Sequence, residues 1–168
     1  MFEVDKGSDG QSNGSESYRI RWPKEHEEML SRLCKNSDGK GSNIFDTYKE
    51  ALVFCACVGF EQSRKKKVSK SGEPIAQDYF KPLDHVLINC IALADTNDPN
   101  ILSKSRLRDK FSIFEEYAAA GMDDLRIRVF DQADWSSAFL EWIQSQNPAF
   151  GDKSGILGQL GSMFEVKV

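Results

Sequence analysis

Residues 55–70, "CACVGFEQSRKKKVSK", hold the residue types in this chain that most readily suggest chemistry, namely cysteine and a run of cations. Cys55 and Cys57 are separated by one residue, one fewer than in the two-residue loops of zinc knuckles, and no second Cys or His pair follows them. Residues two apart on a helix point about 200° away from each other, so both thiolates could not reach one ion. We therefore expect structural cysteines and no metal site here.

The run of cations that follows has the chemistry of a phosphate-binding segment, because each Lys or Arg contact with a phosphate adds salt-dependent affinity. Its members are Arg64, Lys65, Lys66, Lys67 and Lys70. Residues 61–72 carry these five cations and one glutamate, a net charge of +4, which leaves −8 on the rest of a chain whose total is −4. That excess of acid would repel a nucleic acid. Nucleic-acid binding by this segment is one interpretation, and a solvated connecting loop is the other.

Three groups of acidic residues are further candidates for chemistry. Asp152, Glu165 and Lys167 resemble the acidic–Glu-x-Lys signature with which many nucleases hold Mg²⁺, so a Mg²⁺-dependent nuclease is one alternative function. Such carboxylates need rigid strands and a supporting shell, whereas this stretch is rich in glycine. The acidic pairs at 115–116 and 123–124 are expected on a solvated face, because adjacent helical residues diverge by about 100°. We predict no catalytic residue, no bound metal and no cofactor.

The elements that must position these residues can be predicted from the apolar spacing. "YRIRW" at 18–22 alternates apolar residues with Arg19 and Arg21, which predicts a short strand with one apolar face. A helix is expected from about Pro23 to Cys34. His26 and His85, the two histidines, are expected at or near the surface and close to helix N-termini.

Four more helices are predicted downstream. Thr47 and Glu50 match a capping box at the start of a mostly buried helix that Gly59 is placed to end. Apolar spacing predicts a third helix over about 83–94 and a fourth from near Ser105 to Gly121. The last, amphipathic helix is "ADWSSAFLEWIQSQ". "EPIAQDYFKP" reads as an extended connection or brief strand, and the pattern of 125–130 fits a strand and a helix equally.

Length and composition favour one domain, since 168 residues with 40% hydrophobic content can bury a core without disulfides. The predicted fold is mainly α, with α+β as the alternative: a compact multi-helix domain with a short N-terminal strand over 18–146. Residues 1–17 are expected to form a disordered leader and 147–168 a glycine-rich tail. No secretory signal and no apolar run of about 20 residues is present, so we expect a cytoplasmic protein with reduced thiols and no contact with a membrane.

Four blocks of sequence together resemble a known family. They are "FDTYKEALVFCACVGF", "EPIAQDYF", "INCIALADTNDPNIL" and "FSIFEEYAAAGMDDL", and with their spacing the resemblance covers about residues 18–125. The family is that of the bacterial DNA phosphorothioation-associated protein 4, small proteins encoded beside the Dnd sulphur-modification and restriction systems. The resemblance implies a place in anti-phage DNA modification or restriction and supplies no catalytic residues, because its motifs are mostly core and cap residues.

A second likeness is to the ribbon-helix-helix unit, in which paired strands of a dimer enter the DNA major groove. In that alternative Arg19 and Arg21 would contact DNA. The long loop between the two helices and the hundred residues that follow do not belong to such a unit. The sequence therefore predicts a non-enzymatic accessory or adaptor protein that binds proteins of a DNA-modification or restriction complex. DNA is a further partner in this prediction, and a homo-oligomer is compatible with it.

Overall fold

The computed structural model describes residues 17–34 and 44–146. Within them lie five α-helices, α1 to α5, and a two-stranded antiparallel sheet, β1 and β2, which confirms the mainly helical fold with a short N-terminal strand. Most of the predicted leader, the whole predicted tail and the nuclease candidates Asp152, Glu165 and Lys167 lie outside the described residues. Short turns of 3₁₀-helix join the elements: η1 (Lys24–His26), η2 (Gln77–Tyr79), η3 (Pro99–Leu102) and η4 (Lys104–Arg106).

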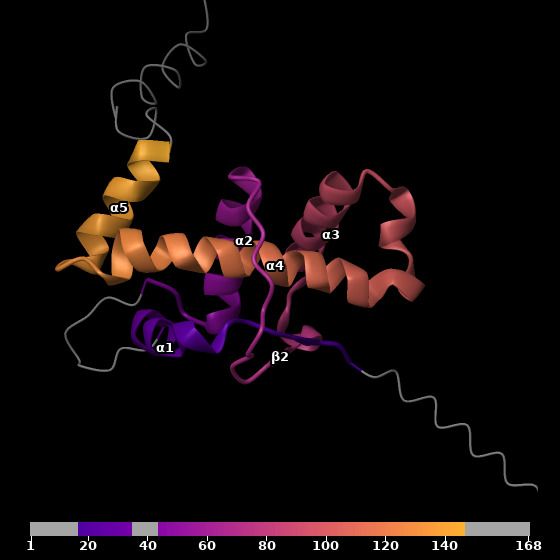
Figure 1. Ribbon diagram of the computed structural model, residues 1–168, viewed down its shortest axis with the longest axis horizontal. Helices are drawn as coiled ribbons and strands as arrows, with labels where there is room; N and C mark the ends of the chain where they lie inside the picture. The colour runs from indigo at the N-terminus through magenta and orange to yellow at the C-terminus, as the bar shows by residue number, and fades with distance from the viewer. Residues whose placement is uncertain (1–16, 35–43, 147–168) are drawn as a thin grey trace, which may run out of the picture.

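The fold is organised around α4 (Leu107–Leu125), the longest helix, which α2 (Tyr48–Glu61) crosses near its middle (Figure 1). The crossing is close because each helix contributes a glycine. A Cβ on Gly59 would overlap the carbonyl oxygen of Tyr117, and a Cβ on Gly121 would overlap that of Cys55. Both glycines were predicted to end their helices, and this is wrong: α2 continues to Glu61 and α4 to Leu125. Their role is to let two backbones approach.

The N-terminal segment forms a small ribbon against α4. β1 (Arg19–Ile20) pairs antiparallel with β2 (Ile75–Ala76). Its alternation is as predicted, since Ile20 and Trp22 are buried while Arg19 and Arg21 are exposed. Hydrogen bonds from Gly72 N to Trp22 O and from Gln77 N to Tyr18 O extend the pairing on both sides.

This pairing within one chain differs from the ribbon-helix-helix arrangement considered above. In that unit the first strand pairs with the same strand of a second copy. Here one edge of β1 is occupied by β2, and on the other edge the N–H of Arg21 donates to the carboxylate of Glu115 on α4. The strand edge that the dimer would need is therefore already used.

The helix predicted from about Pro23 starts as the 3₁₀ turn η1 and becomes α-helical only at Glu27, whereas the second helix begins at its predicted cap, Thr47. After η1, α1 (Glu27–Cys34) buries Met29, Leu30 and Leu33. At the start of α2, Thr47 Oγ1 accepts a hydrogen bond from Glu50 N, and the Glu50 carboxylate accepts one from Asp46 N. The continuous helix through Cys55 and Cys57 confirms that their side chains diverge, with Cys55 fully buried and Cys57 half-buried.

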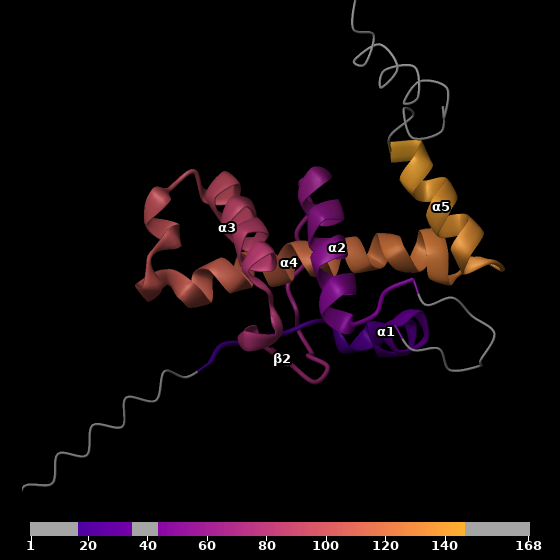
Figure 2. The same cartoon turned by 180° about the vertical axis from the view of Figure 1, so that it is seen from behind.

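The remaining helices lie at the two ends of α4. α3 (Pro82–Thr96) packs near its N-terminal half, and α5 (Trp135–Gln146) follows its C-terminal end (Figures 1 and 2). The segment whose pattern fitted either a strand or a helix is a π-helix, Arg126–Phe130, that prolongs α4. On α5, Trp142 is buried against Phe54 of α2. No helix in the described ranges is both long and apolar enough to cross a membrane.

Candidate functional site

Three of the five cations in the basic segment between α2 and β2 form ion pairs with acids of α3 and α4. Arg64 binds both carboxylate oxygens of Asp124 at 3.0 and 3.1 Å, and Lys65 binds Asp95 of α3 at 2.7 Å. The main chain is held as well, because Arg64 N donates to Gly59 O and Lys66 N to Glu116 O. The segment is thus a connection tethered by its main chain and by the side chains of Arg64 and Lys65.

Two members of the run differ from the rest. Lys67 and Lys70 form no ion pair with any residue in the described part of the chain. Lys67 shares a cavity of about 290 Å³ with Arg21, Glu115 and Glu116, so the structure brings two of the predicted nucleic-acid-binding cations together, in the company of two acids. Arg19 lies apart, on the exposed side of β1, with its guanidinium 3.4 Å from Pro74 O. That these seven cations bind nucleic acid stays a prediction.

Lys66 lies at the centre of a cluster made by η1 and α4. Its ammonium is 2.7 Å from Glu25 Oε1 and 2.8 Å from Asp123 Oδ1. His26 Nε2 is 3.1 Å from the same Asp123 oxygen. Glu25, His26 and Asp123 offer ligand atoms that lie within 4.8 Å of one another, which is a spacing that a metal ion could use. The Lys66 ammonium already lies between the two carboxylates and offsets one of their two negative charges.

His26 is buried, with 2% of its surface exposed, and the expectation of a surface histidine is wrong. Burial lowers the pKa of His26, and the hydrogen bond and negative charge of Asp123 oppose this shift only in part. A neutral ring that donates its Nε2–H to Asp123 fits the geometry. Nδ1 then has no partner among the described residues.

Three of the four carboxylates in the acidic pairs of α4 anchor other elements, so the predicted solvated face is wrong for them. Glu115 is 1% exposed and accepts hydrogen bonds from Arg21 N at 2.8 Å, from the Arg21 guanidinium at 2.8 and 3.1 Å and from Tyr18 OH at 3.2 Å. Burial, with the charge and hydrogen bond of Glu115, raises the pKa of Tyr18 to about 12. Sequence reasoning missed these roles, because the partners of Glu115 lie more than ninety residues away along the chain.

A second anchor joins α3 to the core. The carboxylate of Asp95 accepts from both Lys65 and Tyr117 OH, each at 2.7 Å. Burial raises the pKa of Asp95, but the hydrogen bonds from Lys65 and Tyr117 outweigh it, so the pKa lies below its usual value. At the other end of α3, Lys49 binds Asp84 at 2.7 Å. Both acidic side chains of α3 are therefore directed at cations of the body of the protein.

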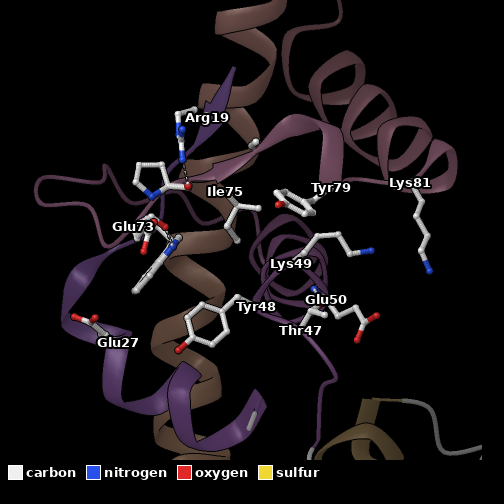
Figure 3. A pocket seen from close by; sticks show the side chains of 13 residues that line it. Arg19, Glu27, Thr47, Tyr48, Lys49, Glu50, Glu73, Ile75, Tyr79 and Lys81 are labelled. Atoms are coloured by element: carbon white, nitrogen blue, oxygen red, sulfur yellow. Dashed lines mark hydrogen bonds between the residues drawn. The ribbon is translucent and has the colours of Figure 1, made fainter. Parts of the chain in front are cut away.

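The larger cavity, about 710 Å³, opens between the β1–β2 ribbon, α1 and the N-terminal end of α2. Figure 3 shows Tyr48, Ile75 and Tyr79 around that helix end, while Arg19 and Lys81 extend away from it. Trp22 contributes a buried wall, fixed by a hydrogen bond from its Nε1 to Glu73 O. The charged lining residues are three cations and three carboxylates: Arg19, Lys49, Lys81, Glu27, Glu50 and Glu73. One of these cations, Lys49, is already paired with Asp84.

The lining of this cavity combines aromatic and aliphatic surface with charges of both signs. Its formal charge of zero gives a phosphate backbone no electrostatic preference. Exposed aromatic surface beside charges of both signs is typical of sites that hold a protein segment.

The profile of the family described as DNA sulphur modification system-associated protein 4 matches residues 19–154. The chain belongs to this family. The match confirms the family to which the sequence blocks pointed and extends beyond them, from residue 125 to residue 154. It covers the ribbon, the five helices and both cavities. No curated protein and no solved structure matches the chain.

Membership associates the protein with a DNA sulphur modification system. The anchors, the cavity and the cations described above all lie on the part of the chain that the family shares.

Proposed function

We propose that this protein is a non-catalytic accessory protein of a bacterial DNA phosphorothioation-linked defence system, and that it binds a segment of a partner protein in the 710 Å³ cavity. The observation that carries the proposal is the lining of that cavity. Tyr79 is 73% exposed at its edge, beside the half-buried Tyr48 and Ile75, so aromatic and aliphatic surface is available to an incoming side chain.

The distribution of charge supports a protein partner over DNA as the main ligand. Arg64, Lys65 and Lys66 would have to leave Asp124, Asp95 and Asp123 before they could contact phosphates. Each such exchange removes an internal ion pair for every external one that it forms. A protein segment in the cavity requires no such exchange, since its lining side chains are already placed around an open space.

The test is co-purification of the tagged full-length chain with proteins of the sulphur modification system from the native host. We expect the partner to be captured by the wild type and to be lost from Tyr79→Ala and Glu73→Lys, two substitutions at exposed residues of the cavity. Leu140→Ala is the matched control, because Leu140 is 59% exposed on α5, at the other end of the molecule. Equal capture by the wild type and both cavity variants would contradict binding in the cavity.

Direct DNA binding is a second candidate, favoured by one observation: Lys67 and Lys70 form no ion pair with a described residue. In this case a labelled duplex should bind more weakly as salt rises, and Lys67→Glu with Lys70→Glu should abolish binding. These two positions test the idea better than Lys65 or Lys66, whose replacement would also remove internal ion pairs. Absence of binding at about 50 mM salt, where phosphate contacts are strongest, would eliminate this candidate.

A further inference from the structure

Helix α3 presents an apolar face to solvent. Leu83 is 81% exposed and Val86 56% exposed, Cys90 is exposed, and Leu93 is half-buried. The opposite face of the same helix is the one that packs on the body of the protein, through Ile88, Ile91 and Ala92. A surface helix of a monomer normally places polar residues on the face away from the core. α3 is apolar on both faces.

Among the described residues of α3, Pro82–Thr96, none with a charged side chain lies on this outer face. The two acidic residues of α3, Asp84 and Asp95, are turned toward Lys49 and Lys65 of the body of the protein. The first charged residues beyond the helix are Lys81 before it and Asp98 after it. Fifteen residues of helix, about 22 Å in length, therefore offer an uncharged surface, which is the property that distinguishes the centre of a protein interface from its surroundings.

The spacing of the exposed residues is that of a seam between two helices. Leu83, Val86, Cys90 and Leu93 follow one another at intervals of three, four and three residues, the a and d positions of a heptad. A seam of this kind fits one partner helix that lies along it. An extended peptide would match a period of two instead.

We propose that the partner is α3 of a second copy, packed antiparallel to the first. In an antiparallel pair the a and d positions face each other, so that Leu83 meets Leu93 of the second copy and Val86 meets its Cys90. The four positions are symmetric about residue 88, so a two-fold axis there brings the seam onto itself, as a pairing of identical surfaces requires.

The charges at the two ends of α3 favour the same orientation. Lys81 stands at the N-terminal end, where its own helix dipole is unfavourable to a cation, and Figure 3 shows its side chain extending away from the cavity. The C-terminal end carries the negative end of the dipole and Asp98, which is 42% exposed and lies 3.8 Å from Arg106 of the same copy. Antiparallel packing places each Lys81 within one helical turn of Asp98 of the other copy. Parallel packing would bring the two Lys81 side chains together.

A pairing through one helix from each copy is at the small end of known interface sizes, about 1,200 Å² or less in total, so we expect a reversible dimer that depends on concentration. Size-exclusion chromatography with light scattering on the full-length chain should show a shift from monomer to dimer as concentration rises. Val86→Glu should abolish the shift. Ile127→Glu should retain it, because Ile127 is 63% exposed on the π-helix, away from α3. A wild type that is monomeric at about 1 mM, where even a dimer with a Kd of about 100 μM is mostly formed, would overturn the proposal.

Disulfide cross-linking tests the orientation. In Val86→Cys the new thiol should face Cys90 of the other copy at a separation compatible with a disulfide, about 4.4 to 6.8 Å between Cα atoms. Diamide, which takes up the two hydrogen atoms that the thiols lose, should link this variant rapidly. Val86→Cys with Cys90→Ser should link slowly, since residues 86 of the two copies are offset along the helix. Ile127→Cys provides the control for random collision.

Two results of this experiment would overturn the antiparallel pairing. The first is fast linkage of Val86→Cys with Cys90→Ser, because the antiparallel pair symmetric about residue 88 places residue 86 opposite residue 90 and not opposite residue 86. The second is linkage of Val86→Cys no faster than that of Ile127→Cys. The experiment needs no partner protein, so its outcome is independent of whether the cavity binds one.

Discussion

The segment between α2 and β2 and the helix α3 use their side chains in opposite ways. The segment is strongly charged, yet three of its cations are bound to acids of α3 and α4. α3 is largely apolar, yet Leu83 and Val86 face solvent. The charged element is therefore engaged inside the molecule, and the apolar element is available outside it. In both elements, the side chains that remain available to a partner are those on the side that does not pack against the body of the protein.

The largest effect on stability is expected at the crossing of α2 and α4, on which the other elements pack. Gly121→Ala would force a methyl group into the carbonyl of Cys55, and main-chain atoms cannot turn aside. Overpacking of this kind costs about 3 kcal/mol, more than the gain of about 1 kcal/mol that alanine brings to a helix. We expect a clear loss of free energy of unfolding in urea. A variant stabilised by about 1 kcal/mol would show that helix propensity alone operates there and that the crossing is looser than the structure has it.

Glu115→Gln should have the next largest effect, because it removes the charge that Arg21 and Tyr18 share. Hydrogen bonds to a buried charged group contribute about 1.5 to 3 kcal/mol, so we expect a loss of about 2 kcal/mol in chemical denaturation. The pKa of Tyr18, raised to about 12 in the wild type by burial and by Glu115, should fall in ultraviolet titration. Glu116→Gln is the adjacent control, since Glu116 contributes its carbonyl to Lys66 N and should change stability by less than about 0.5 kcal/mol.

How far these contacts could be predicted from sequence depends on their range along the chain. Local signals worked: the alternation at 18–22, the Thr47 cap and the periodicity of α3 correctly predicted their elements. Gly59 and Gly121 were misread because a glycine that ends a helix and a glycine that admits another backbone look alike in one sequence. The apolar spacing of α3 identified a helix but could not say which of its faces meets the core.

The site was less accessible to prediction than the fold. The cations of the basic segment were found by composition, but their partners lie 30 to 60 residues away, and no local pattern links Lys65 to Asp95 or Arg64 to Asp124. The 710 Å³ cavity combines residues from 19 to 81, most of which read as ordinary strand, cap or loop positions. Family membership was recognisable because its blocks are core and cap residues, which are the same residues that say least about a binding site.

The buried His26 should make the free energy of unfolding depend on pH. Its pKa is lowered in the folded protein by burial, so the unfolded chain binds a proton more readily. Stability is then fully present above the unfolded pKa of about 6.5 and is lost as pH falls from there toward the folded value. In His26→Gln this loss should disappear from the denaturation midpoints measured between about pH 7 and 5. An unchanged slope in the variant would assign the dependence to other groups.

A smaller effect should separate two neighbouring lysines. Lys66 bridges Glu25 and Asp123, whereas Lys67 has no ion pair among the described residues. Because Lys66 is 39% exposed, water screens its ion pairs, and Lys66→Gln should cost about 0.5 to 1 kcal/mol. Lys67→Gln should cost about zero. Equal losses in the two variants would mean that the segment is held by its main chain alone, through Arg64 N and Lys66 N.

The smallest effect on the isolated fold should come from the outer face of α3. Leu83→Ala removes a side chain that is 81% exposed, so the free energy of unfolding of the monomer should change by less than about 0.5 kcal/mol. Ile91→Ala, on the inner face of the same helix and 3% exposed, should lose about 2 to 4 kcal/mol. Urea denaturation at low protein concentration measures both. If Leu83→Ala were as destabilising as Ile91→Ala, this face of α3 would be covered by the protein itself, and the contrast between an engaged charged segment and an available apolar helix would be lost.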